Sequence, residues 1–194
     1  MVARDDAGLR SALTQLEEAE LVFRRGEPPE AAYSFKHALV QDAAYESLLK
    51  SRRQVLHRRT AEALRDRFPT VAETEPEFVA HHFAQASLTA AAVEWWQKAG
   101  ERALNSSALN EAIAHLEKAL GLAQELADGP AQRGLRLRLQ ITYGNALLHS
   151  LGQASPESSA AFARARELAA DRRSRQQVFG LLLRAQNSRP CGRG

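Results

Sequence analysis

The 194-residue sequence contains one cysteine, one methionine and few aromatic residues. Cys191 has no partner for an internal disulfide bond, and no cysteine-based metal cluster can form around it. No apolar run approaches the ~18 residues that a membrane-spanning helix needs, and the first residues lack the apolar stretch of a signal peptide. We therefore expect a cytoplasmic protein without membrane contact.

Sequence patterns that mark catalytic sites are also absent. No Gly-x4-Gly-Lys-Ser/Thr phosphate loop occurs, although such a loop supplies the lysine and the backbone amides that hold nucleotide phosphates. His81 and His82 are the best pair for a metal, but adjacent helical residues point about 100° apart, and no His-x3-His or HExxH pattern accompanies them. No nucleophile and no group that could stabilise an oxyanion accompanies His37, Asp42 and Tyr45. This favours helix-capping or hydrogen-bonding roles for them. We predict no enzyme activity, no cofactor and no metal ion.

The residues that are abundant favour helices. Hydrophobic residues make up 44% of the chain and charged residues 25%, with a formal net charge of +3, and alanine and leucine dominate the apolar set. Arginines gather late in the chain, at Arg164, Arg166, Arg172, Arg173, Arg175, Arg184, Arg189 and Arg193. Because Phe179 is the single aromatic residue between them, a solvated helix face and a frayed end explain this cluster better than a nucleic-acid site does.

The first 36 residues have the pattern of a helix followed by a hairpin. Apolar residues recur at three and four over residues 9–19, which is the period of an amphipathic helix. Residues 21–25 and 32–36 are two short runs rich in aromatic or β-branched residues on either side of a Gly/Pro turn, which predicts a β-hairpin. We interpret residues 1–36 as the remnant of a winged helix.

A winged helix raises the question of DNA binding. The helix that would enter the groove carries Glu17, Glu18 and Glu20 against a single Arg10. These carboxylates would repel the phosphates, so the sequence argues against a DNA partner.

Residues 37–75 are predicted to be a helical linker. Its first helix ends near Lys50 and has an apolar stripe formed by Leu39, Val40, Ala43, Ala44, Leu48 and Leu49. The second spans residues 51–68, is rich in arginine, and would turn inward Val55, Leu56, Ala61, Ala63 and Leu64. The stretch from Pro69 to Pro76 is expected to break the helix.

From residue 76 onward only helices are predicted. Helical repeats are expected over residues 76–186, followed by a disordered tail at 187–194. The expected helices are 77–86, 89–106, 110–126, 131–151, 156–170 and 174–185. Because short connections join them, neighbouring helices should be antiparallel.

Two helices in this region carry spacings that resemble the tetratricopeptide repeat. That pattern requires a large aromatic residue, small residues where two helices cross, and then alanine and a large apolar residue in the return helix. The residues at these positions are Trp96, Ala99, Gly100, Ala103, Ala112, Leu116 and Ala119. Small side chains at Gly100 and Ala112 would let the two backbones approach closely. We therefore predict a mainly α fold with an array of tetratricopeptide-like hairpins, an α-solenoid.

A second unit is fainter and needs about two extra residues in its turn. Its corresponding positions are Tyr143, Gly144, Leu147, Ser158, Phe162 and Ala165. Residues 92–99 also resemble residues 112–119 at an offset of twenty, so one helix can belong to either of two hairpins. The boundaries between units stay open for this reason.

Trp95 is the candidate for partner binding. Trp96 falls on the large-residue position of the repeat and should be core. Trp95 points about 100° away from it and is either an anchor for a peptide in a groove or packed on the preceding helix.

One segment between the hairpin and the repeats resembles a known family. The run YSFKHALVQDAAYESLL from Tyr33 to Leu49, the run RQVLHRRTA from Arg53 to Ala61, and AHHF from Ala80 to Phe83 are similar to a region of large bacterial signalling proteins. These are adenylate/guanylate-cyclase-type proteins and related transcriptional regulators that join an AAA/STAND-class ATPase to tetratricopeptide repeats. The resemblance extends over about residues 9–168.

The resemblance implies a role in signal transduction without chemistry in this chain. The ATPase and cyclase residues of such proteins lie upstream of this region, so none is carried over. The helix around His57 would be a linker that reports the ATPase state to the repeats, or a plain structural helix. We expect a regulatory scaffold that binds a protein or peptide, with self-association left open. The alternative is the C-terminal part of an ATP-dependent signalling enzyme whose activity belongs to other domains.

Overall fold

The computed structural model describes residues 6–27, 31–152 and 155–170 of the chain. These residues are mainly helical, with one small antiparallel sheet. Backbone packing divides the chain into two compact units, Met1–Arg53 and Gln54–Gly194. The predicted helix at 174–185, the predicted tail at 187–194 and Cys191 lie outside the described residues.

The first unit contains the predicted helix and hairpin. Helix α1 spans Asp6–Glu18, strand β1 Val22–Arg25, strand β2 Ala32–Phe35 and helix α2 Ala38–Glu46. The two strands pair antiparallel, from Val22 opposite Phe35 to Arg25 opposite Ala32. The strands lie on either side of the Gly/Pro segment, as the two runs of aromatic or β-branched residues predicted.

The core of this first unit is very small. Among the described residues of this unit, Val22 alone has a buried apolar side chain. Helix α2 has no buried residue. The apolar stripe predicted over residues 39–49 is largely exposed: Leu39 is 82% exposed and Leu49 78%. Amphipathic spacing sets which residues share a face, but burial also requires a second element to cover that face.

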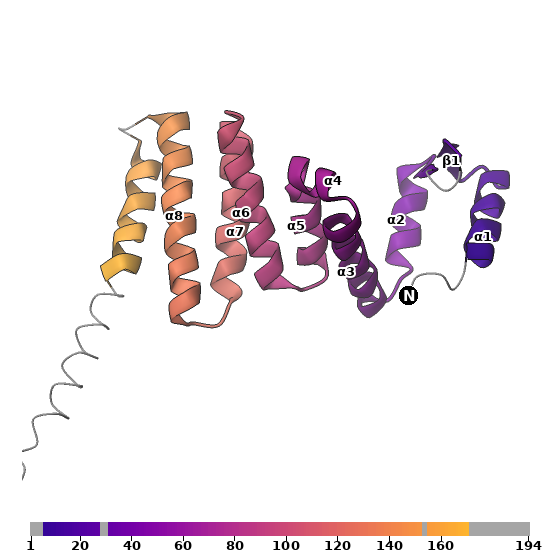
Figure 1. The fold of residues 1–194 in the computed structure, drawn as a ribbon, viewed down its shortest axis with the longest axis horizontal. Coiled ribbons are helices and arrows are strands. Elements are labelled where there is room, and N and C mark those ends of the chain that lie inside the picture. The colour runs from indigo at the N-terminus through magenta and orange to yellow at the C-terminus, as the bar shows by residue number, and fades with distance from the viewer. Residues whose placement is uncertain (1–5, 28–30, 153–154, 171–194) are drawn as a thin grey trace, which may run out of the picture. The chain divides into compact units, whose positions relative to one another are not determined.

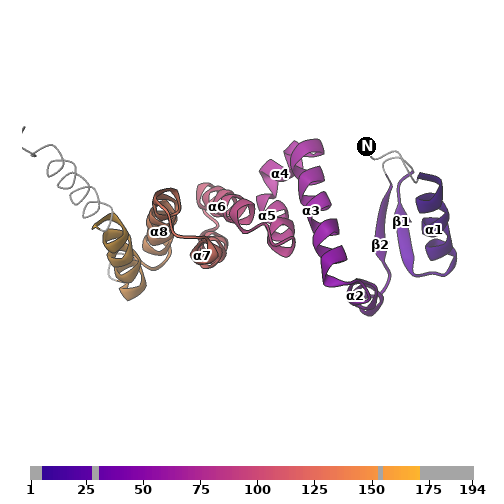
Figure 2. The ribbon, with the colours of Figure 1, turned by 90° about the horizontal axis from the view of Figure 1, so that it is seen from below.

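The second unit begins within helix α3 (Lys50–Arg67) and continues with α4 (Pro69–Thr74), α5 (Pro76–Gln85), α6 (Thr89–Asn105), α7 (Leu109–Glu125) and α8 (Pro130–Leu151). A further helix spans residues 156–170. Each of α5, α6 and α7 packs against the next helix in the chain, and α8 also contacts α6. Figures 1 and 2 show α5 to α8 as a series of neighbouring helices.

Helix α4 corrects one expectation. The preceding helix ends at Arg67, as the predicted break at Pro69 requires, but the stretch that follows forms a short helix that was not expected. Proline is compatible with the first turn, because the N–H that it lacks has no helical acceptor there. Ala72 on α4 is 2% exposed and belongs to the core.

Helix α3 is attached to the core by a narrow stripe. Ala61 is its buried residue, and Leu64 packs against the core while partly exposed. Val55 and Leu56, which were expected to face inward, are 43% and 38% exposed. The helix is too rich in arginine to bury a wide face.

The turns before α6 and α7 have the same geometry, twenty residues apart. Ser87 and Ser107 adopt left-handed backbone conformations, with φ of 57° and 60°. In each turn this serine and the next residue donate backbone hydrogen bonds to the end of the preceding helix: Leu88 N to Phe83 O at 3.0 Å, and Ala108 N to Ala103 O at 2.9 Å. This is the Schellman cap, which satisfies the last carbonyls of a helix and reverses the chain.

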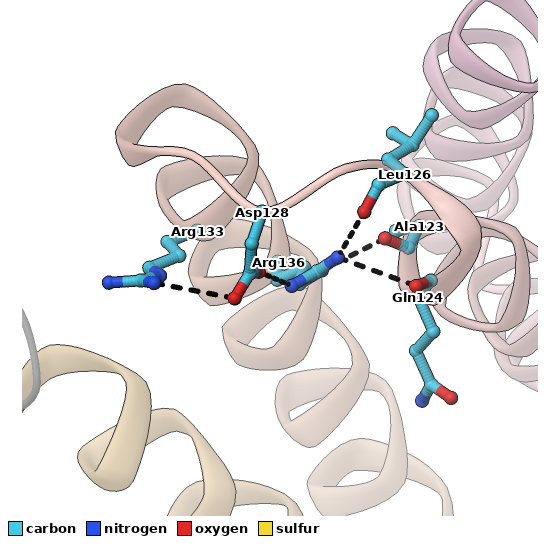
Figure 3. Close-up of polar contacts among 6 residues, drawn as sticks. All are labelled: Ala123, Gln124, Leu126, Asp128, Arg133 and Arg136. Carbon is cyan, nitrogen blue, oxygen red and sulfur yellow. Dashed lines mark hydrogen bonds and ion pairs between the residues drawn. The ribbon is translucent and has the colours of Figure 1, made fainter.

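Arg136 joins α7 to α8 (Figure 3). Its guanidinium donates hydrogen bonds to the carbonyl oxygens of Ala123 at 2.9 Å and Leu126 at 2.8 Å, which lie at the end of α7. It also donates to Asp128 Oδ1 at 2.6 Å. The last carbonyls of a helix lack intrahelical partners and form its negative end, so a cation from α8 satisfies them and complements the dipole.

Candidate functional site

The predicted packing residues of the first hairpin lie where α6 crosses α7. Gly100 faces Leu116, and a Cβ atom built on Gly100 would lie 2.6 Å from Leu116 Cγ. Only a residue without a side chain allows this approach. The other predicted positions of this hairpin are buried: Trp96, Ala99, Ala103, Ala112 and Ala119.

The predicted residues of the second unit meet between α8 and the helix at 156–170. A Cβ atom on Gly144 would lie 3.0 Å from Phe162 Cε1, and Ala165 is 6% exposed. Tyr143, next to Gly144, turns toward α7 and donates a hydrogen bond from its hydroxyl to Glu117 Oε1 at 2.8 Å. Burial and this bond to a carboxylate raise the pKa of Tyr143 to about 12.

Trp96 is enclosed by two side chains of α7. Its ring stacks on His115 with centroids 5.2 Å apart, and Lys118 Nζ lies 4.4 Å from its ring centroid. Burial lowers the pKa of His115, and within the described residues its Nδ1 is buried without a hydrogen-bond partner. Trp96 therefore serves the packing of the hairpin and is not available to a ligand.

Trp95 lies in an open groove of about 440 Å³ between α6, α4 and the end of α3. The ring packs partly against the core and is partly exposed. Ala72 and Pro76 form the apolar part of the lining around it. The expected packing of Trp95 is therefore seen in part, and its role as an anchor for a peptide stays a prediction.

The rim of the Trp95 groove is charged. It carries Arg65, Lys98 and Arg102 together with the carboxylates of Glu73 and Glu101. Arg65 is held by Asp66 at 2.7 Å, whereas Lys98 and Arg102 have no ion pair with any residue that the structure describes. Lys98 Nζ lies 4.1 Å from the Trp95 ring centroid, a cation–π contact. Tryptophan and arginine in a concave site are typical of protein-binding hot spots.

A second hollow of about 500 Å³ lies over α7, α8 and the helix at 156–170. Its lining includes Arg136, Arg164 and Glu167. The guanidinium of Arg136 is already bound to the carbonyls at the end of α7. This hollow has no aromatic residue, so the Trp95 groove is the better candidate.

Sequence reasoning missed a cluster of three histidines. His57 on α3 meets His81 and His82 on α5: the His57 and His82 Nδ1 atoms lie 2.8 Å apart, and the three ring centroids are 5.0 to 6.0 Å apart. No group of three potential ligands in the described segments has metal-site geometry. Burial, followed by His57 and His81, lowers the pKa of His82 to about 4. Only the tertiary packing of α3 on α5 could reveal this cluster.

The other polar residues considered from the sequence do not form a site. His37 is the residue that precedes α2, but its side chain makes no capping hydrogen bond. The Arg53 guanidinium lies over the Tyr45 ring, with Cζ 4.9 Å from the ring centroid. Asp42 is exposed on α2.

No helix in the part that the structure describes is long and apolar enough to cross a membrane.

Comparison with known proteins gives one relative of interest. An uncharacterized protein of Rhizobium meliloti (strain 1021) is 30% identical over 171 residues, which cover 88% of this chain and 17% of that protein. The chain thus spans less than a fifth of the length of this relative. No protein-family model matches the chain, and no solved structure matches it.

Proposed function

We propose that this protein is a non-catalytic scaffold that binds a protein or peptide in the Trp95 groove. The observation that carries the proposal is the pairing of a half-buried tryptophan with two cations, Lys98 and Arg102, that have no ion pair among the described residues. An indole ring offers a large contact area at little entropic cost, and the cations orient a polar or acidic partner.

The packing of the helices supports a scaffold of tetratricopeptide-like hairpins. Small residues at the α6–α7 crossing, the close contact of Gly144 with Phe162 and the two equal turns at Ser87 and Ser107 are what a repeated hairpin requires. In such an array each helix pair contacts its neighbours and leaves an extended face for a partner. The resemblance to the repeat region of bacterial ATPase-containing signalling proteins would make the role regulatory.

Selection from a random peptide library tests this function. Peptides selected on the purified chain should bind it, and Trp95→Ala should weaken their binding by tenfold or more, because truncation of a hot-spot tryptophan typically costs about 2 kcal/mol or more. Glu94→Ala is the matched control, since Glu94 is an exposed neighbour on α6 outside the groove. Selected peptides that bind both variants equally would place the site elsewhere.

The second candidate function is that of a regulatory part within a larger ATP-dependent signalling enzyme. The relative from Rhizobium meliloti favours it, because the matched region is only 17% of that protein. Reading the DNA upstream of Met1 for an in-frame phosphate loop distinguishes this second candidate function from the first. A phosphate loop there would assign this chain to a larger ATPase, and the groove would then regulate its output.

A further inference from the structure

The attachment of α3 to the rest of the second unit depends on few side chains. One stripe of the helix makes the contact, at positions 54, 57, 61, 64 and 65. Gln54 Nε2 donates a hydrogen bond to Ser87 Oγ at 2.8 Å, and Arg65 lies 5.9 Å from the Phe83 ring centroid. Ala61 is the residue of α3 that is fully buried. A change at one contact can therefore alter the whole attachment.

The His57–His82 contact is a hydrogen bond that depends on protonation. With 2.8 Å between the two Nδ1 atoms, one must carry a proton and donate while the other accepts with its lone pair. A neutral pair satisfies this condition, and so does a pair with one extra proton. When both rings are imidazolium, both Nδ1 atoms are donors, so the bond is lost and two cations face each other.

The charges that act on His82 oppose a second positive charge in the pair. His81 lies on the same side, with ring centroids 6.0 Å from His57 and 5.5 Å from His82. On α3 the nearest carboxylate along the helix, Glu62, is bound by Arg58 at 2.8 Å. The charges that act on His82 come from His57 and His81, and both oppose its protonation. On the loop side, Gln54 and Ser87 are neutral.

We propose that His57 and His82 form a proton-sensitive latch that holds α3 on α5 and releases it when both imidazoles are protonated. When α3 is released, the His82 ring on α5 is solvated and titrates at its ordinary pKa of 6.5, whereas in the docked state its pKa is about 4. The released state therefore binds more protons between these two values, and acid shifts the equilibrium toward it. The latch does not depend on the Trp95 groove being a binding site.

Nuclear magnetic resonance relaxation of the full chain tests the latch. At pH 7 the α3 amides of residues 54–67 should be as rigid as those of α5, with order parameters of about 0.85. Near pH 4 the α3 values should fall below about 0.6 while α6 and α7 stay rigid. The samples contain a chelator, so that bound transition metal cannot produce the effect.

Four variants make the test specific. His82→Gln should keep α3 rigid at both pH values, because glutamine can accept the bond from His57 without becoming charged; His57→Gln is the reciprocal variant if the first fails to fold. His81→Gln removes a charge that opposes the protonation of His82 in the docked state, so it should move the release to lower pH. His149→Gln, on an exposed position of α8, should behave as the wild type. Wild-type α3 that stays rigid at pH 4, or release that persists in both glutamine variants of the pair, would overturn the proposal.

Discussion

Gly100 and Leu116 lie so close that a single added carbon would collide with the leucine, at 2.6 Å from Cγ and 2.8 Å from Cδ2. Leu116 is fully buried and lies at the centre of the α6–α7 crossing. This contact sets the distance between the two helices, so it determines the geometry of the hairpin on which Trp95 is presented.

Gly100→Ala should destabilise the protein, because the methyl group would force Leu116 or the helix to shift. Overpacking of this kind costs about 1–3 kcal/mol. Urea denaturation followed by circular dichroism measures the change. Gly121→Ala is the control: Gly121 lies in the interior of α7 with nothing within 4 Å of a Cβ, so alanine should stabilise it by about 0.5–1 kcal/mol. Equal effects of the two substitutions would contradict the crossing.

Arg136→Gln should lower the free energy of unfolding by about 1–3 kcal/mol, since it leaves the carbonyls of Ala123 and Leu126 without their donor. Arg138→Gln, at an exposed position on the same helix, should change it by no more than about 0.5 kcal/mol. Thermal melts of both variants and the wild type give the comparison. If the two variants melt at the same temperature, Arg136 does not join α7 to α8.

Tyr143 makes stability depend on alkaline pH. Its folded-state pKa is raised to about 12 from an ordinary value of 10. The folded state therefore keeps the phenolic proton over this range while the unfolded state loses it. The stabilisation is fully present below pH 10 and is lost as the pH rises toward 12.

Urea denaturation at several alkaline pH values measures this loss, and a tyrosinate absorbance titration locates the pKa. Tyr143→Phe should show a smaller loss of stability above pH 10. Glu117→Gln keeps an acceptor for the hydroxyl but removes the charge, so Tyr143 should titrate at lower pH than in the wild type. An unchanged titration in Glu117→Gln would argue against the hydrogen bond.

Ser107→Gly should stabilise the protein by about 1 kcal/mol, because glycine adopts the left-handed conformation of this turn without steric cost. Ser87→Gly relieves the same strain but removes the hydroxyl that accepts the Gln54 hydrogen bond. Its gain should therefore be smaller, and α3 should exchange its amide protons faster. Hydrogen exchange with mass spectrometry resolves the two helices, and an equal gain without faster exchange would rule out a role for Gln54 in holding α3.

The helices of the second unit could be predicted because their patterns are local. The periods of three and four, the Gly/Pro and serine turns and the small residues near Trp96 each act within one hairpin. The short helix α4 was missed because proline indicates a helix start as well as a break. Arg136 could not be recognised as a cap, since its acceptors lie 10 to 13 residues earlier, across a turn.

The candidate site could be predicted only in part. The spacing separated Trp95 from the core position of Trp96, and Lys98 and Arg102 follow Trp95 on the same helix. The wall that α3 and α4 add to the groove comes together only through the fold. The histidine cluster joins residues 25 positions apart, and no local pattern indicates such a contact. In the first unit, the apolar pattern of residues 39–49 was visible but its exposure was not, because burial depends on neighbouring elements.

Calorimetric titration of the purified chain with ATP and magnesium, beside an assay of ATP hydrolysis, tests the central claim most directly. A non-catalytic scaffold should give no saturable heat and no hydrolysis above the buffer rate, while a circular-dichroism melt shows a cooperative helical transition. Saturable micromolar binding of ATP would show that the chain contains a phosphate site, and the assignment as a scaffold without chemistry would be wrong.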